Sequence, residues 1–370
     1  MRSWIATLAL LAACGFSSSK TGDDDVDAGL LPDASPPDAS TRFGTIVPVV
    51  LSMYPTATLV VDATDLDIDT GPTSQRCDPA VTQYCAVAAT SFVVAAGRKI
   101  RARGLRPLVL VSLTTFDLSG DIDVSSVQDG TAGAGALPAA DCMGVTPPPV
   151  LPTGNSGGFG GSFGGKGSDG DAVGGNRGAA SMFTVSWPSP LRGGCPGSAG
   201  AGSGGFGGFV GGAVAIVADS ISITGRINAS GAGGRGGGVA KSGGGGGGSG
   251  GMIILDVPPS RITRNAAGVL FASGGGGGEG GTGGSMPATG RDGGNAVAPA
   301  VGALGGTSIN DGGDGGLGSF GHVLNGGNTP GQGGGGDGGG GGGGGGAGII
   351  YAPGITGDTL IAPPSPTITP

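Results

Sequence analysis

Residues 212–230, GAVAIVADSISITGRINAS, contain the pattern that decides the fold. Apolar side chains recur at every second position from Val214 to Ala218, again from Ile221 and, after Gly225, from Ile227. Alternation with period two is typical of β-strands. Polar residues fill the remaining positions of the second and third runs, so we expect one face of these strands to contact water. The stretch therefore predicts three short strands joined by tight corners.

The same pattern occurs 105 positions earlier, in residues 107–125, PLVLVSLTTFDLSGDIDVS. The ungapped alignment of the two stretches matches Val109, Val111 and Leu113 with Val214, Ile216 and Ala218, Phe116 and Leu118 with Ile221 and Ile223, Gly120 with Gly225, and Ile122 and Val124 with Ile227 and Ala229. So many matched positions indicate an internal repeat.

Further copies flank these two. A third begins at Gly251 and carries a four-residue insertion around Pro258–Pro259, and a weaker fourth begins near Gly348. A shorter relative occupies residues 92–104, and residues 59–71, LVVDATDLDIDTG, alternate in the same way. We expect this last segment to cap the array, because an open strand edge promotes aggregation.

The repeats predict an all-β fold in which coils of about 20 residues stack as a parallel β-helix or β-solenoid. A single coil cannot bury its apolar face, whereas stacked coils cover one another. Long glycine tracts separate the copies, at 154–178, 193–212, 231–251, 274–295 and 333–348. Each follows the third strand of a coil, so we expect the tracts to emerge at one edge. The sequence leaves open whether they are mobile loops or extended polyglycine strands bonded side by side.

The N-terminus resembles a bacterial lipoprotein signal. Arg2 precedes an apolar run from Trp4 to Ala13, which is shorter than the roughly 20 residues that a membrane-spanning helix needs. The run ends in Leu11-Ala12-Ala13-Cys14-Gly15, which is similar to a lipobox. The resemblance implies cleavage before Cys14 and acylation of its thiol, and Gly15 in place of aspartate favours the outer membrane or cell surface. An ordinary secretory signal is the alternative.

Three regions follow from this. Residues 1–13 are the expected signal peptide, 14–44 a lipidated cysteine with a disordered tether, and 45–370 the glycine-rich domain. The tether contains the acidic run 23–25 and a Pro/Asp/Ala/Ser stretch at 31–40. Such a composition buries too little apolar surface to offset the entropy of ordering the chain.

Glycine supplies 91 of the 370 residues without the strict three-residue period of collagen. The net charge of −8 argues against nucleic acid as a partner, because phosphates require basic patches. Four cysteines remain beyond Cys14, and an even number in an exported protein indicates two disulfides. Of the three possible pairings we favour Cys77–Cys85 with Cys142–Cys195, since each encloses one irregular segment.

Few residues offer catalytic chemistry. Asp117, Asp121 and Asp123 are expected on the outer face of one coil, with Arg226 near Asp121 if the copies stack directly. This set is either an acid/base cluster or a solvated face with an ion pair. The only glutamate, Glu279, excludes a pair of glutamates. The only histidine, His322, lies in a predicted surface loop without a nucleophile motif.

A structural calcium site is the one cofactor that the sequence suggests. Asp65, Asp67 and Asp69 alternate, so their carboxylates share one face of a strand. Gly71 stands one position late for an EF-hand, and Arg76 occupies the place of the closing glutamate. A plain acidic surface is the alternative. We expect no other cofactor.

The chain resembles the glycine-rich, PGRS-like surface lipoproteins of myxobacteria. The resemblance rests on the segments 105–108 (LRPL), 120–125 (GDIDVS), 191–197 (LRGGCPG) and 212–231, and it covers most of residues 45–352. It implies a surface lipoprotein and no defined activity.

Together these features predict a non-enzymatic lipoprotein of the cell envelope with a structural, adhesive or display role. Its expected partners are the membrane, through the lipid anchor, and envelope polysaccharide or other surface proteins. The alternative is a parallel β-helix that binds or cleaves carbohydrate. Parallel β-helices include polysaccharide lyases and hydrolases, although that analogy concerns the fold alone.

Overall fold

The computed structural model describes residues 42–128, 130–136, 142–143, 148–185, 189–307, 311–330, 336–355 and 361–363. Residues 41–370 form one compact unit. Its strands belong to three parallel sheets and one antiparallel hairpin. The predicted signal peptide, Cys14 and most of the predicted tether lie outside the described residues.

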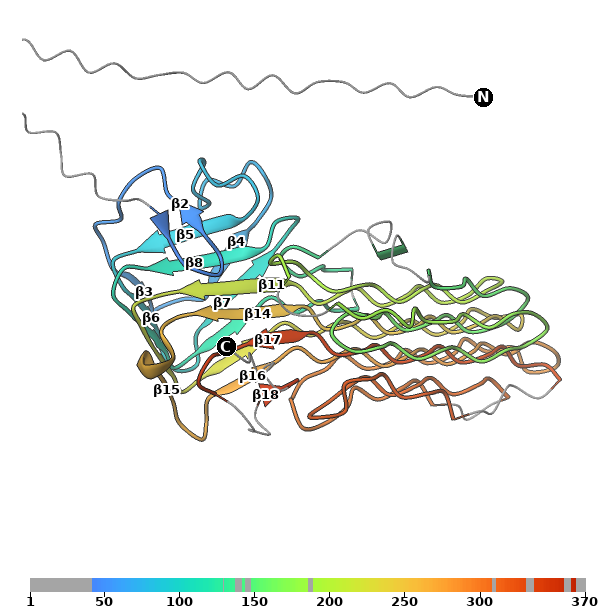
Figure 1. Cartoon of the computed structure of the whole chain (residues 1–370). Coiled ribbons are helices and arrows are strands. Elements are labelled where there is room, and N and C mark those ends of the chain that lie inside the picture. The colour runs from blue at the N-terminus through green and yellow to red at the C-terminus, as the bar shows by residue number, and fades with distance from the viewer. Residues whose placement is uncertain are drawn as a thin grey trace, which may run out of the picture. The chain divides into compact units, whose positions relative to one another are not determined.

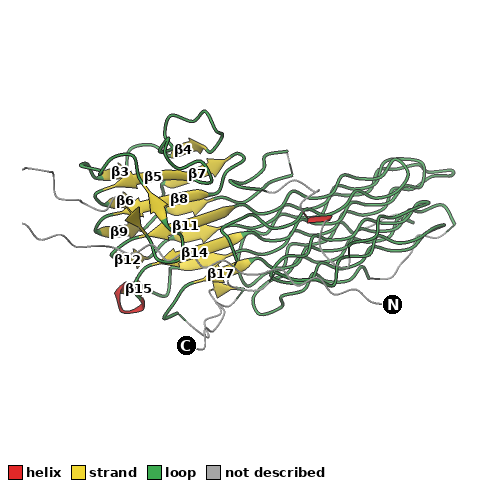
Figure 2. Cartoon of the chain, turned by 45° about the horizontal axis from the view of Figure 1, so that its top comes forward, coloured by secondary structure: helices red, strands yellow, loops and turns green. Residues whose placement is uncertain are grey.

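The chain visits the three sheets in turn (Figures 1 and 2). The first sheet contains β5 (Cys85–Ala89), β8 (Leu108–Ser112), β11 (Ala213–Val217), β14 (Met252–Asp256) and β17 (Ile349–Tyr351). The second contains β3 (Leu59–Val61), β6 (Phe92–Val94), β9 (Thr115–Leu118), β12 (Ser220–Ile223) and β15 (Ile262–Arg264). The third contains β4 (Leu66–Asp69), β7 (Lys99–Arg103), β10 (Asp121–Asp123), β13 (Arg226–Asn228), β16 (Val269–Phe271) and β18 (Ile361–Ala362).

We call these three sheets the β-stack. Each strand inside a sheet pairs in parallel with its counterparts in the preceding and following coils, and each strand at the end of a sheet with one of them, which is compatible with a β-solenoid-like fold. The four-residue insertion of the third copy contains a short 3-10 helix, η1 (Pro259–Arg261). Residues 59–69 form the first rung, as the sequence predicts, with Ile68 buried and Asp67 and Asp69 exposed.

Apolar side chains of equivalent strands stack on one another inside the β-stack. In the third sheet Ile100, Ile122, Ile227 and Leu270 follow one another from coil to coil. In the second sheet the rings of Phe92 and Phe116 stack with centroids 4.9 Å apart. A buried aliphatic side chain contributes about 1.5–3 kcal/mol relative to exposure, so stacking of coils is the main stabilising term here.

The predicted register is right for two of the three strands and wrong for the first. Ile221 pairs with Phe116 and Ile227 with Ile122, as the alignment requires. In the first sheet, however, Val214 pairs with Leu108 and Ile216 with Leu110, one residue away from the predicted Val109 and Val111. Val109 and Val111 therefore do not face inward as the alignment predicts, and Leu113 lies beyond the end of β8.

The physical reason is that the first sheet is buried on both faces. Leu108 and Leu110 face the interior of the β-stack, whereas Val109 and Val111 face a second core on the outer side. This second core is covered by residues 46–51, which include β2 (Val49–Val50) of the hairpin with β1 (Arg42–Phe43). A strand that is apolar on both faces carries no alternation from which its register could be predicted.

The hairpin segment is held on the β-stack by one buried carboxylate. The Asp256 carboxylate accepts hydrogen bonds from the backbone N–H groups of Thr45, Ile46 and Val47 at 2.8, 2.8 and 3.0 Å, and from the Thr45 hydroxyl at 2.8 Å. Gly44 has a φ of +80°, and a Cβ there would lie 2.3 Å from the Val47 carbonyl oxygen. Glycine at this position therefore allows the hairpin segment to approach Asp256 closely.

The glycine tracts form a second array, the glycine bundle, which comprises the described residues of 155–178, 194–212, 231–251, 274–306, 311–328 and 338–348. These segments run beside one another away from and back to one edge of the β-stack (Figures 1 and 2). Backbone bonds to a given neighbour recur at every third residue. Gly244, Gly247 and Gly250, for example, donate to Gly340, Gly343 and Gly346 at 2.8–3.0 Å. Extended helices of the polyproline II type have three residues per turn and no internal hydrogen bonds, so all their backbone bonds are made to other segments. The segments of the bundle show this pattern.

Segment 243–251 has six such neighbours. Its N–H groups donate to segments 195–201, 229–235 and 340–346, and its carbonyl groups accept from segments 158–161, 205–211 and 275–281. Segments 273–281 and 338–348 are also enclosed by neighbours. A Cβ at Gly247 would lie 2.1 Å from the carbonyl oxygen of Gly275, and one at Gly342 2.1 Å from that of Gly245. The longest glycine runs of the sequence are thus the interior helices of the bundle, where a side chain has no room.

Both expected disulfides are present. Cys77 is bonded to Cys85 and Cys142 to Cys195. The first ties the loop after β4 to the start of β5, and the second ties Cys142 to segment 193–201 of the glycine bundle.

The bundle interior predicts a large effect of a single methyl group. Gly247→Ala should lower the free energy of unfolding by about 3 kcal/mol, because the methyl group displaces the neighbouring backbone. Gly283→Ala is the matched control, since its Cβ would meet nothing closer than 3.5 Å. Denaturant unfolding of both variants measures this, and equal stability of the two would contradict the packing.

Candidate functional site

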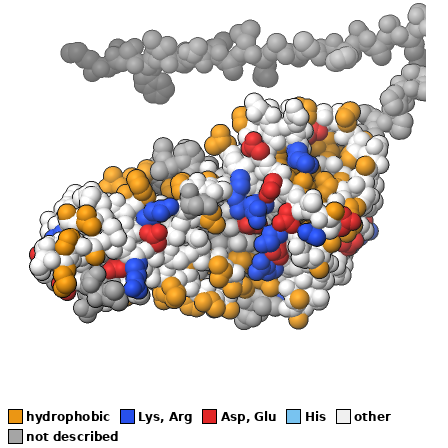
Figure 3. Space-filling view, turned by 180° about the vertical axis from the view of Figure 1, so that it is seen from behind, with side chains coloured by type: hydrophobic (Ala, Val, Ile, Leu, Met, Phe, Trp, Pro, Cys, Tyr) orange, Lys and Arg blue, Asp and Glu red, His pale blue; other side chains and the backbone are white. Residues whose placement is uncertain are grey.

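The outer face of the third sheet carries a ladder of paired charges. Its strands contribute acidic and basic side chains in alternating order across the sheet: Asp67 from β4, Lys99, Arg101 and Arg103 from β7, Asp121 and Asp123 from β10, and Arg226 from β13. These residues share one face because alternate residues of a strand point the same way. Figure 3 shows basic and acidic side chains intermingled on this side of the β-stack.

Asp121 and Asp123 are the centre of this ladder. Arg226 binds both carboxylate oxygens of Asp121 at 3.0 and 3.1 Å, and Lys99 lies 3.7 Å from the same group. Asp123 contacts Arg103 at 3.1 Å and Arg101 at 3.8 Å. The hydrogen bond to Asp121 raises the pKa of Arg226 against the opposing effect of burial. The predicted proximity of Arg226 to Asp121 is therefore confirmed.

A hollow of about 260 Å³ lies beside this ladder. It is lined by Lys99, Asp121, Asp123 and Arg226 together with polar side chains of neighbouring segments, namely Ser125, Asn228 and Asn295. Asp117, which the sequence analysis grouped with Asp121 and Asp123, is not part of it. Asp117 belongs to β9 in the second sheet, because the chain turns a corner at Ser119–Gly120 before β10 begins. Three of the four expected residues thus converge.

The predicted calcium ligands take other contacts. The Asp65 carboxylate accepts the backbone N–H of Lys99 at 3.1 Å, Asp67 pairs with Arg101 at 3.4 Å, and Asp69 accepts the N–H of Gly71 at 2.8 Å. Among the residues that the structure describes, no group of three or more His, Cys, Asp or Glu side chains could hold a metal ion. The three carboxylates therefore bind separate partners along residues 65–69 rather than gathering as ligands.

Glu279 and His322 lie apart from the ladder, in the glycine bundle. Glu279 is 4% exposed, and its carboxylate accepts the backbone N–H of Arg291 at 2.8 Å. It thus helps to fasten two neighbouring segments. His322 is exposed in a turn flanked by the bridge between Phe320 and Val323, as expected for a surface loop.

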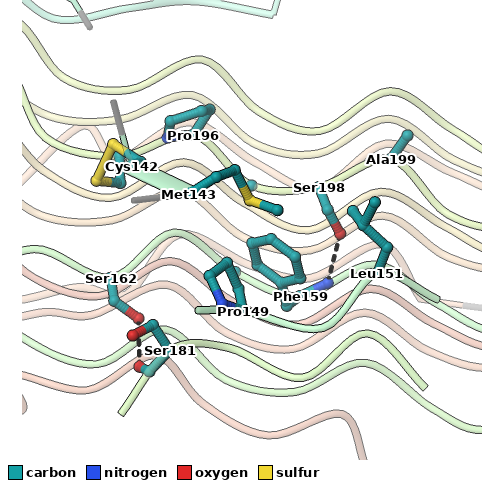
Figure 4. Close-up of a pocket in the computed structure, with 13 residues that line it drawn as sticks. Cys142, Met143, Pro149, Leu151, Phe159, Ser162, Ser181, Pro196, Ser198 and Ala199 are labelled. Carbon is teal, nitrogen blue, oxygen red and sulfur yellow. Dashed lines mark hydrogen bonds between the residues drawn. A yellow bond between two sulfur atoms is a disulfide. The ribbon is translucent and has the colours of Figure 1, made fainter. Parts of the chain in front are cut away.

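An apolar groove of about 330 Å³ lies on the glycine bundle beside the disulfide Cys142–Cys195 (Figure 4). Its walls are two bundle segments, with Phe159 and Ser162 on one and Pro196 and Ala199 on the other. The remaining side chains around the groove are Met143, Pro149, Leu151, Ser181 and Ser198. Ser198 faces Phe159 in Figure 4 and accepts the Phe159 N–H at 2.9 Å.

This groove has no counterpart among the features predicted from the sequence. Its residues come from segments that read as irregular or glycine-rich, between positions 142 and 199. One signal was present in the sequence, namely side chains spaced by three within the glycine tracts, as in Pro196 and Ala199 or Phe206 and Phe209. That spacing places residues on one side of a polyproline II helix.

A third, polar hollow of about 450 Å³ lies among Lys166, Asp169, Asp171, Arg177 and Thr329. Asp169 pairs with Arg177 at 3.5 Å and with Lys166 at 3.9 Å. The Thr329 hydroxyl donates to one carboxylate oxygen of Asp171. The other oxygen is buried and has no hydrogen-bond partner among the described residues. Burial raises the pKa of Asp171 above its ordinary value of 3.8, despite the hydrogen bond from Thr329.

Comparison of the chain with protein families, with curated proteins and with solved structures finds no match. Within the described residues, no helix has both the length and the apolar character that crossing a membrane requires.

The Asp171 environment predicts a pH-dependent effect on stability. A raised pKa in the folded state means that the ionised carboxylate destabilises the fold at neutral pH, and that this penalty disappears below pH 3.8, where both states are protonated. Asp171→Asn should therefore raise Tm near pH 7 and leave it unchanged near pH 3. Asp169→Asn, which removes two ion pairs, should not raise Tm at either pH. Thermal unfolding at both pH values decides this, and a lower Tm of Asp171→Asn at neutral pH would contradict it.

Proposed function

We propose that this chain is a non-enzymatic surface lipoprotein of the bacterial cell envelope, anchored through Cys14, with a structural, adhesive or display role. In this proposal a tether carries a β-solenoid from which the glycine bundle projects. The proposal combines the lipobox-like segment 11–15 and the resemblance to PGRS-like surface lipoproteins with the architecture of the folded domain.

The observation that supports it most is the surface of the glycine bundle. Interior helices contain almost only glycine, whereas outer segments expose large apolar side chains, including Phe206 (75% exposed), Met286 (78%) and Leu304 (68%). Figure 3 shows several such apolar patches on the side turned to the viewer. A backbone held by hydrogen bonds to several neighbours can present these side chains in fixed positions. Exposed apolar patches of this kind are typical of contact surfaces.

Carbohydrate binding is the second candidate, and the hollow beside Asp121, Asp123 and Arg226 favours it. Carboxylate, guanidinium and amide groups around a concave surface are suitable partners for sugar hydroxyl groups. Both carboxylates already bind basic side chains, so the arrangement supports binding better than proton transfer. Asp117, on another sheet, does not extend the cluster.

The lipid anchor can be tested by intact mass. The membrane-extracted protein should carry a diacylated or triacylated N-terminal cysteine, and Cys14→Ser should abolish both the added mass and the membrane association. Ser18→Ala, in the predicted tether, is the control and should behave as the wild type.

Protease treatment of intact cells then tests display, since a surface domain is digested without lysis. An unmodified chain that is cleaved elsewhere and found in the medium would contradict the anchor. It would favour a released carbohydrate-binding protein.

A further inference from the structure

The apolar groove of Figure 4 lies along one pair of hydrogen-bonded segments of the glycine bundle. Its two walls, segments 157–163 and 195–201, are bonded to each other: the Ser198 N–H donates to the Phe159 carbonyl at 2.9 Å and the Ala201 N–H to that of Ser156 at 2.9 Å. Both walls also bond to segment 243–251 on one side, through Gly158 with Gly244 and Gly246 with Ser198. The groove lies along the same pair of segments, where the regular array would place a further helix.

The hydrogen-bonding rows of segment 195–201 show which groups face this position. N–H groups of Gly194, Gly197 and Gly200 donate to segment 205–211, and those of Ser198 and Ala201 donate to segment 156–159. The third row contains Pro196, which has no N–H group, and Ala199, whose N–H has no partner among the described residues. Both residues line the groove, and Ala199 is exposed. One donor is therefore available to a neighbouring chain.

The side chains around the groove suit proline rings. Pro149, Pro196, Phe159, Leu151 and Met143 supply apolar surface on both walls and the rim, and Leu151 is 57% exposed. Among the described residues, none that lines the groove carries a charge. Proline-rich segments adopt the polyproline II conformation before binding, so ordering them costs little entropy, and aromatic-lined grooves recognise them. Such a segment has the same three-residue period as the walls.

We infer that this groove binds a proline-rich peptide segment in the polyproline II conformation, which adds one helix to the glycine bundle. The peptide would pack its rings against Phe159, Leu151 and Pro196 and accept a hydrogen bond from the Ala199 N–H at one of its carbonyl groups. The proposed adhesive role thereby gains a class of partner, the proline-rich segments of other envelope proteins. The inference depends on that role only for the location of the partner.

The test is calorimetric titration of the full mature chain, reconstituted in phosphatidylcholine nanodiscs, with a nine-residue oligoproline. Saturable binding is expected to oligoproline and not to a glycine–serine peptide of equal length. Leu151→Ser should raise Kd about tenfold through loss of apolar contact. Val150→Ser changes the neighbouring residue, which is 50% exposed and does not line the groove, and should leave Kd within about twofold.

Ala199→Pro isolates the hydrogen bond. Pro196 already occupies the same row, so proline suits the backbone conformation, and the substitution replaces the N–H donor with a ring carbon that cannot donate. We expect Kd to rise about fivefold with Tm unchanged. Absence of saturable binding up to about 1 mM oligoproline would overturn the proposal. So would equal binding of the glycine–serine peptide, or binding of decanoate that oligoproline does not displace, which would assign the groove to an acyl chain. None of these results bears on the acylation of Cys14, so failure of this inference is distinguishable from failure of the proposed lipid anchor.

Discussion

The hydrogen bond between the backbones of neighbouring polyproline II helices is the interaction on which the whole glycine bundle depends. A helix of this type makes no internal bonds, so each buried N–H and C=O group must find its partner on another segment. In segment 243–251 the N–H groups are shared among three neighbours and the carbonyl groups are used by three more. The backbones approach so closely that a Cβ at Gly247 would overlap the carbonyl oxygen of Gly275. Glycine is therefore required for packing here rather than for flexibility.

The β-stack supplies what the bundle lacks, namely a hydrophobic core. Segments 231–251 and 338–348 lead into or out of strands whose register is fixed by buried side chains, as in the pairing of Ile253 with Val214 and Ile350. Each bundle segment thus starts or ends beside its neighbour, and loop closure costs little for the short turns between segments. Disulfide Cys142–Cys195 and the buried Glu279 fasten the bundle at two further points. The ordered bundle in turn holds Phe206 and Ala199 at the surface in the positions on which the proposed contacts depend.

The sequence predicts the fold where alternation between apolar and polar residues exists. It places Ile221 on Phe116 and Arg226 beside Asp121 correctly, because one face of each of these strands contacts water and the side chains therefore alternate between apolar and polar. It misplaces Val109 and Val111 by one residue, since Leu108 and Leu110 are equally apolar and either set could face inward. Asp117 was grouped with Asp121 because alternation along the chain does not reveal the corner at which β9 passes into another sheet. The glycine tracts carry few side chains, so their three-residue spacing, as in Pro196 and Ala199, indicates one side of a helix but not which segments lie next to it.

Backbone hydrogen exchange of segment 243–251, compared with strand β11, tests the central claim most directly. The account predicts that the amides of Gly244, Gly247 and Gly250 are protected to nearly the same degree as those of Ala215 and Ile216, because each is bonded inside the array. Exchange of these glycine amides at the rate of an unstructured chain, with β11 still protected, would contradict the account and would make the tracts mobile loops.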